Sequence, residues 1–184
     1  MATLWKQGAK LLKCSSGKLA YQDDCPCGEF TCPTDCTSCP STYTLSWTDG
    51  VIEACYDGGG IFTRVTDTFS AGSCTITKND CTWDNNSCGP SVSRYYEGRD
   101  LGCDGTVIYS DTIGMAGTLY LACSAYDSGV YRWGVFADFG ESPPQPQFYY
   151  AIFGKGSCPP TGTVATYAAE QSTLISSSVS WTLE

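Results

Sequence analysis

Thirteen cysteines in a chain of 184 residues constrain its fold more than any other feature. Five of them, Cys25, Cys27, Cys32, Cys36 and Cys39, fall within fifteen residues. A four-thiolate zinc site usually needs two Cys-x2-Cys pairs, and only Cys36 and Cys39 form one. A plant-type iron–sulfur loop needs a four-residue gap followed by a two-residue gap, and here a three-residue gap follows. Because further cysteines need the same explanation, we predict disulfides rather than a metal or cofactor site.

The number of cysteines also limits how they can pair. Because thirteen is odd, at least one cysteine cannot pair within a single chain, and Cys14 is the candidate because it stands alone in the N-terminal region. The most local pair that we predict joins Cys81 to Cys88. A redox role for Cys36 and Cys39 would need a helix N-terminus, and the sequence predicts none there. Cysteines on separate predicted elements include Cys55, Cys74, Cys81, Cys88, Cys103, Cys123 and Cys158.

The chain contains no histidine. This excludes Ser-His-Asp and Cys-His catalysis and every zinc site built on histidine. The 19 acidic residues select no particular catalytic pair, and the loops that begin at Asp84 and Asp100 do not have EF-hand spacing. We therefore expect a protein that is not an enzyme, with no catalytic residues, no metal and no cofactor.

Charge is distributed unevenly along the chain. Lys6, Lys10, Lys13 and Lys18 lie in the first 18 residues, which contain no acidic residue. Residues 19–184 hold the other 6 basic and all 19 acidic side chains, a net charge of −13. The acidic part disfavours nucleic acid and anionic membrane surfaces as partners. The lysines have two open interpretations: they keep the N-terminus soluble, or they bind another surface.

Short runs with alternating apolar residues predict an all-β fold. Tyr43, Leu45 and Trp47 share one face of a predicted strand, and residues 51–56 are expected as its hairpin partner across a turn. Residues 79–105 are rich in turn formers and predict irregular structure. We expect ten to twelve strands in a single disulfide-rich β-sandwich, jelly-roll or immunoglobulin-like. The predicted strands lie within 42–47, 51–56, 58–72, 73–78, 106–114, 117–126, 130–139, 148–153 and 174–184.

The sequence divides into three parts. Residues 1–22 predict a basic N-terminal arm that contains a β-hairpin, residues 23–40 a linker rich in Cys and Pro, and residues 41–184 the β-sandwich domain. The stretch 163–174 is a weak helix candidate because it contains Ala168, Ala169 and Glu170. We interpret the linker as a disulfide-stapled segment that fixes the direction of the arm.

The cysteine content predicts an oxidising, extracellular location. The N-terminal residues lack the apolar run of a signal peptide, because Lys6, Gln7 and Lys10 interrupt it. The first residue could be a mature start, or the protein could leave the cell by lysis or by a dedicated route. A third explanation, reduced cysteines that bind metal in the cytosol, fits the rest of the chain less well. No 18-residue apolar run that could insert into a membrane is present.

Two surface features are predicted from individual residues. Trp83 lies in a polar stretch and is expected to be exposed, whereas Trp47, Trp133 and Trp181 lie on apolar strand faces and are expected in the core. The triplet from Asn85 to Ser87 has the N-glycosylation pattern, so Asn85 is a candidate acceptor.

In its basic arm, its Cys- and Pro-rich linker, its short strands and its final "SVSWTLE", the chain resembles cysteine-rich β-sandwich subunits of bacterial surface fibres and phage particles. The resemblance implies a structural subunit that polymerises with copies of itself, as a helical filament or a virion-type assembly, through arm-to-body contacts. The alternative is a carbohydrate-binding module or adhesin, with glycans as partners. The expected subunit-interface residues are Lys6, Lys10, Leu11, Leu12, Lys13, Cys14 and Lys18.

Overall fold

The computed structural model describes residues 11–13, 19–21, 30–57, 61–85, 87–127, 130–140, 148–166 and 172–184. The chain forms two compact units, Met1–Thr31 and Cys32–Glu184. In the first unit, β1 (Leu11–Lys13) and β2 (Leu19–Tyr21) form the predicted antiparallel pair, with Leu12 opposite Ala20. Cys32, Cys36 and Cys39 belong to the second unit.

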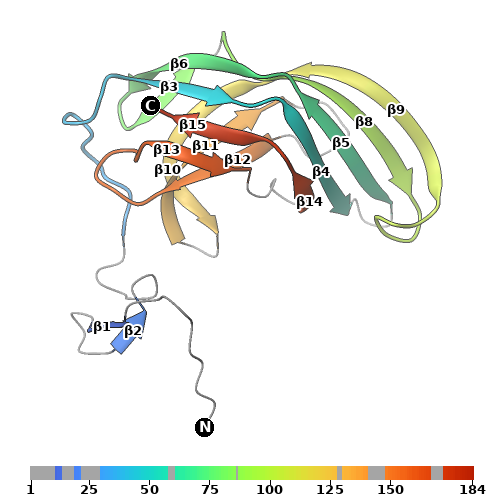
Figure 1. Ribbon diagram of the computed structural model, residues 1–184, viewed down its shortest axis with the longest axis horizontal. Coiled ribbons are helices and arrows are strands. Elements are labelled where there is room, and N and C mark those ends of the chain that lie inside the picture. The colour runs from blue at the N-terminus through green and yellow to red at the C-terminus, as the bar shows by residue number, and fades with distance from the viewer. Residues whose placement is uncertain are drawn as a thin grey trace. The chain divides into compact units, whose positions relative to one another are not determined.

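The described part of the second unit is all-β and contains two antiparallel sheets (Figure 1). The eight-stranded sheet has the order β12 (Phe148–Gly154), β11 (Val130–Asp138), β10 (Thr118–Asp127), β7 (Thr82–Asn85), β6 (Gly72–Asn79), β3 (Thr42–Trp47), β15 (Ser180–Leu183) and β13 (Gly162–Ala165). The five-stranded sheet has the order β14 (Ser172–Ser177), β4 (Gly50–Asp57), β5 (Phe62–Phe69), β8 (Ser91–Arg99) and β9 (Val107–Ala116). This arrangement matches neither the seven strands of an immunoglobulin constant domain nor the eight of a jelly roll, so neither finer class is confirmed.

The two sheets share one aromatic core. Trp83, Trp133 and Trp181 of the eight-stranded sheet are fully buried. Phe69 of β5 comes from the other sheet and contacts Trp181, with ring centroids 6.1 Å apart, and Tyr149, with centroids 5.8 Å apart. Trp47, Trp133 and Trp181 are therefore in the core as predicted, because the alternation in their strands turns them inward.

Trp83 corrects the sequence-based expectation, since its side chain is completely buried. It lies on β7, packs edge-on against Tyr43 and Trp133, and donates from Nε1 to the Pro40 carbonyl at 3.0 Å. The polar neighbours that suggested a loop occupy the other positions of a four-residue strand. The prediction that 79–105 is irregular was also wrong, because β7 and the whole of β8 lie there.

Two further strand predictions were wrong because the chain changes sheets twice at one corner. β3 and β4 do not form a hairpin: after Trp47 the chain crosses from one sheet to the other. The segment between β14 and β15 crosses beside it, with hydrogen bonds from Thr48 N–H to the Ser180 carbonyl (3.0 Å) and from Ser178 N–H to the Val51 carbonyl (2.9 Å). Such corners are made by strands that switch sheets.

The same crossing divides the C-terminal run that was predicted as one strand. Ile175 lies on β14 and is 44% exposed, whereas Trp181 and Leu183 are buried on β15 of the other sheet. Val179 is buried in the connection between the two strands. The weak helix candidate is wrong at both ends, where Gly162–Ala165 and Ser172–Ser177 are strands, and residues 167–171 lie outside the described part. None of the described residues forms a helix that could cross a membrane.

Candidate functional site: a disulfide-stapled body with an open sheet edge

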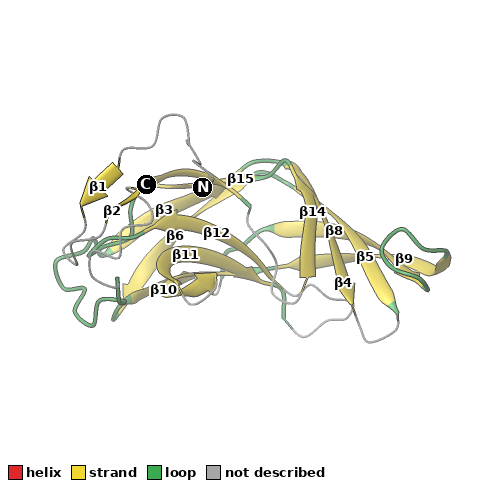
Figure 2. Cartoon of the chain, turned by 90° about the horizontal axis from the view of Figure 1, so that it is seen from below, coloured by secondary structure: helices red, strands yellow, loops and turns green. Residues whose placement is uncertain are grey.

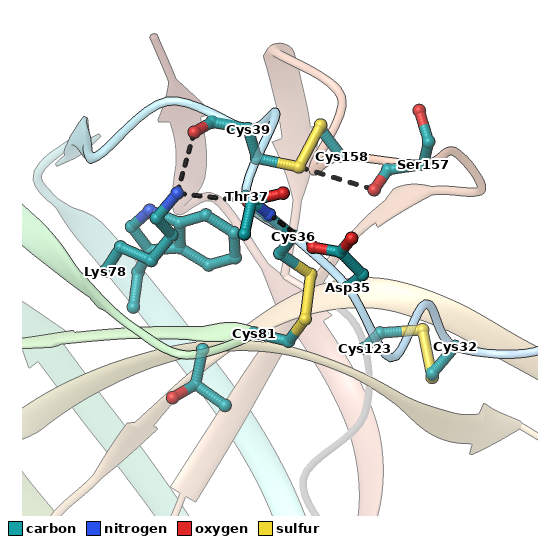
Figure 3. Close-up of a disulfide and its surroundings, with 12 residues drawn as sticks. Cys32, Asp35, Cys36, Thr37, Cys39, Lys78, Cys81, Cys123, Ser157 and Cys158 are labelled. Atoms are coloured by element: carbon teal, nitrogen blue, oxygen red, sulfur yellow. Dashed lines mark hydrogen bonds between the residues drawn. A yellow bond between two sulfur atoms is a disulfide. The ribbon is translucent and has the colours of Figure 1, made fainter.

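Three cysteines of the predicted cluster attach one short segment to distant parts of the chain (Figure 3). Cys32 pairs with Cys123, Cys36 with Cys81 and Cys39 with Cys158, across sequence separations of 91, 45 and 119 residues. Two more disulfides, Cys55–Cys103 and Cys74–Cys88, complete five bonds among the described residues. These bonds indicate an oxidising, extracellular environment.

The predicted bond between Cys81 and Cys88 was therefore wrong. Cys88 reaches Cys74 on the neighbouring strand β6, and Cys81 instead reaches Cys36. Cys81 and Cys88 are close in sequence, but the extended strand β7 lies between them and places them apart at its two ends. Cys14, Cys25 and Cys27 lie outside the described residues, as do the side chains of the predicted interface residues Lys6, Lys10, Leu11, Leu12, Lys13 and Lys18.

Lys78 holds the segment that contains Cys32, Cys36 and Cys39 in a defined conformation. Its Nζ donates to the carbonyl oxygens of Cys36 (3.0 Å) and Cys39 (2.9 Å), as Figure 3 shows. The N–H of Cys39 also donates to the Cys36 carbonyl at 3.0 Å and closes a turn. Among the described residues, no cluster of His, Cys, Asp and Glu could hold a metal ion. Three disulfides and the two hydrogen bonds from Lys78 hold this segment in place.

A buried polar cluster joins the two sheets. Arg94 of β8 donates to both carboxylate oxygens of Asp67 on β5, from Nε at 2.7 Å and from Nη2 at 2.6 Å. The hydroxyl of Tyr149, on β12 of the other sheet, donates to Asp67 Oδ2. Burial, followed by the charge of Asp67, raises the pKa of Tyr149 well above its ordinary value. All three side chains are fully buried, so this cluster is suited to stability rather than to ligand binding.

The sequence indicated only part of this cluster. Alternation in β5 placed Asp67 on the same face as Val65, which is a signal for a buried carboxylate that needs a cationic partner. The same alternation from Val92 would have placed Arg94 inward. No local pattern pairs the two residues with Tyr149, because the hydrogen bond to it crosses between sheets.

The outward face of the five-stranded sheet carries a shallow polar cleft of about 290 Å³. Arg64 approaches Glu53 (3.6 Å) and Asp104 (3.3 Å), and Tyr95 donates to Glu97 at 2.9 Å. A hydrogen bond from Arg99, and a weaker one from Tyr95, lower the pKa of Glu97. Glu97 is therefore held ionised, the opposite of what a general acid requires. The cleft is lined by Glu53, Arg64, Thr66, Tyr95, Glu97 and Arg99.

The candidate glycosylation site is engaged in local hydrogen bonds. Asn85 lies at the end of β7 and donates from Nδ2 to the Thr75 carbonyl at 2.8 Å. Its Oδ1 accepts from both the N–H (2.9 Å) and the hydroxyl (2.8 Å) of Ser87. A glycan on Nδ2 would compete with the hydrogen bond to Thr75.

The edge of the five-stranded sheet is formed by β9, which is drawn at the outer end of the sheet in Figures 1 and 2. β9 has ten residues and pairs only with β8 among the described strands. Most of its residues are exposed, and at its start Val107, Ile108 and Tyr109 are 44%, 56% and 45% exposed. An exposed strand edge presents unpaired N–H and C=O groups that can accept another strand. The sequence predicted this strand but could not indicate that it lies at an edge.

The fold and its bonds define an extracellular, disulfide-rich all-β protein. No protein-family model matches the chain, and no curated protein and no solved structure is significantly similar to it.

Proposed function

We propose that this protein is a non-enzymatic structural subunit that assembles with copies of itself into an extracellular filament or virion-type assembly. The N-terminal arm of one copy, residues 1–22, would contact the body of the next. The observation that carries the proposal is the open ten-residue edge of β9 on a body stabilised by disulfides. Monomeric proteins usually protect such an edge, so its exposure favours a partner.

The body suits a repeating subunit. Its two sheets share a core and would form a β-sandwich, with aromatic contacts and the hydrogen bond between Tyr149 and Asp67 joining them. Disulfides across long loops restrict the unfolded chain, so the subunit would keep its shape outside the cell without chaperones.

Charge favours contacts between copies. The first 18 residues carry four lysines and no acid, whereas residues 19–184 carry a net charge of −13. Opposite charges steer the arm of one molecule to the body of another. Such a contact uses two different surfaces, and when its rotation does not close it generates a helical polymer.

Electron microscopy of negatively stained native protein tests the proposal. The full chain should form regular polymers, and a variant that lacks residues 1–22 should remain monomeric. A matched control lacks only residues 2–5, which removes part of the N-terminus but keeps all four lysines and β1 and β2. This control should still polymerise. Polymers of the variant without residues 1–22 would contradict the arm-to-body model.

The second candidate function is glycan binding, which the polar cleft favours. Carboxylates and guanidinium groups can hydrogen-bond sugar hydroxyls, and Tyr95, which is 42% exposed, offers a ring for stacking. A glycan array should then report binding that Tyr95→Ala weakens and that Tyr131→Ala, at another exposed tyrosine, leaves unchanged. Absence of binding on the array would contradict this function.

A further inference from the structure

We propose that the open edge of β9 is the acceptor for the arm, and that its occupant is the segment Lys10–Tyr21 of a second copy, one strand of which pairs with β9 and extends the five-stranded sheet. This inference rests on the proposed assembly and names the surface that it uses. It is carried by the regularity of this edge, by its exposed apolar residues and by the charge of Asp111.

β9 is the least protected sheet edge among the described strands. It contains no proline, lysine or arginine, and its pairing with β8 is regular from Ala116 to Tyr109. The other three edges of the two large sheets are less suitable, because β13 has only four residues. Register shifts leave at most five regularly paired residues in β12 and three in β14, against eight in β9. Bulges, short strands and charged side chains are the usual protections of an edge. β9 has one charge, on Asp111, and one register shift, at its start between Val107 and Tyr109.

The start of β9 offers apolar surface to an added strand. Val107, Ile108 and Tyr109 are exposed, and Leu101, in the loop before the strand, is 86% exposed. Tyr109 packs edge-on against Tyr96 of β8, with ring centroids 6.3 Å apart, which fixes one side of this surface. An added strand that carries leucines would bury apolar area that is now in contact with water.

The centre of β9 offers a carboxylate to a cation. Asp111 accepts hydrogen bonds from the Thr112 N–H (2.7 Å) and the Tyr96 hydroxyl (3.4 Å). No ion pair formed within the described part of the chain includes Asp111. The segment Lys10–Tyr21 contains three lysines, so an added strand can place a positive charge across from or diagonal to Asp111.

Charge disfavours a second β9 as the occupant. In an antiparallel pair, the residues whose N–H and C=O point outward must face each other, so only alternate registers satisfy the hydrogen bonds. The two allowed registers with the greatest overlap place the Asp111 side chains of the two copies directly opposite or diagonal to each other on the same face. Like charges in these positions destabilise strand pairing.

The arm is able to supply a strand. β1 and β2 already pair with each other over three residues, from Leu11 opposite Tyr21 to Lys13 opposite Leu19. A two-stranded hairpin is only marginally stable in water, and a third strand stabilises it. Binding at β9 therefore stabilises the arm as well as protecting the edge.

Three point variants of the full chain test the acceptor. Asp111→Lys reverses the charge of the edge, and Thr112→Pro removes the N–H that bonds to Asp111 and places a ring at the edge. Asp49→Lys makes the same charge change at an exposed turn between β3 and β4 and is the matched control. Both edge variants should weaken the affinity between copies roughly tenfold or more. Asp111→Lys turns an attraction to the lysines of the arm into a repulsion, and Thr112→Pro removes a strand contact. The control Asp49→Lys should assemble like wild type.

A mixing experiment separates the acceptor from the donor. The variant without residues 1–22 keeps the edge, and Asp111→Lys keeps the arm, so together they should form a discrete one-to-one complex by analytical ultracentrifugation, although each is monomeric alone. If both edge variants assemble like Asp49→Lys while the armless variant stays monomeric, β9 is not the acceptor, although arm-to-body assembly stands. Polymers of the armless variant would instead overturn the proposed function. Unchanged thermal melting of the non-reduced variants controls for folding.

Discussion

Tyr149 on β12 donates its hydroxyl hydrogen bond to Asp67 on β5, across the interface between the two sheets. Asp67 simultaneously receives two hydrogen bonds from Arg94, so one carboxylate holds three donor contacts in a fully buried site. Each residue is costly to bury alone, and the cluster is stable only when it is complete.

Arg94→Met should reduce the free energy of unfolding by about 3–5 kcal/mol, because it leaves the Asp67 carboxylate buried without its cation. The measurement is urea denaturation of the non-reduced protein. The double variant Arg94→Met/Asp67→Leu should be less destabilised than Arg94→Met alone, since it also removes the unpaired charge. Equal losses in both variants would show that shape, rather than charge, dominates at this site.

Alkaline pH should destabilise the protein partly through Tyr149. Burial and the Asp67 charge raise the pKa of Tyr149 in the folded state above its ordinary value of 10.0. The stability that this group contributes is present below pH 10 and is lost as pH rises above it, because the unfolded chain then releases the proton and the folded chain retains it. Denaturation curves from pH 8 to 11 should fall less steeply for Tyr149→Phe than for wild type. Equal slopes would exclude this contribution.

Removal of the Cys39–Cys158 bond by paired Ser substitutions should cost about 1 kcal/mol more than removal of Cys74–Cys88, because it closes a longer loop even when the intact Cys32–Cys123 bond shortens that loop. The sequence separations are 119 and 14 residues. Thermal melting of the two double variants checks the order. Mass spectrometry of non-reduced peptides should first find Cys81 joined to Cys36, and a peptide that joins Cys81 to Cys88 would contradict the fold.

Trp83→Ala should reduce the free energy of unfolding by about 3–5 kcal/mol, because it opens a cavity in the core. The variant also loses the hydrogen bond from Trp83 Nε1 to the carbonyl of Pro40, the residue that follows Cys39. Chemical denaturation measures the loss. Oxidation of tryptophan by N-bromosuccinimide provides an independent check, since Trp83 should react only after unfolding. Rapid reaction of Trp83 in the native protein would contradict its burial.

Alternation of apolar and polar residues in the sequence correctly predicted those strands that bury only one of their two faces. Tyr43, Leu45 and Trp47 face the core as their alternation indicates, and Trp133 and Val135 do so on β11. The pattern failed for β7, because a four-residue strand between turns shows too little alternation to be recognised. It also failed at the corner after Trp47, because a two-residue connection fits a hairpin and a change of sheet equally well.

Composition determined the chemistry that this chain can use, and the tertiary structure determined where that chemistry lies. The absence of histidine, the basic N-terminus and the thirteen cysteines are properties of the sequence alone. Which cysteines pair, which carboxylate is buried beside Arg94 and which strand forms the open edge depend on contacts between residues far apart in the chain. Strand order fixes those contacts, and strand order follows from how both sheets bury their apolar faces together, which no local pattern records.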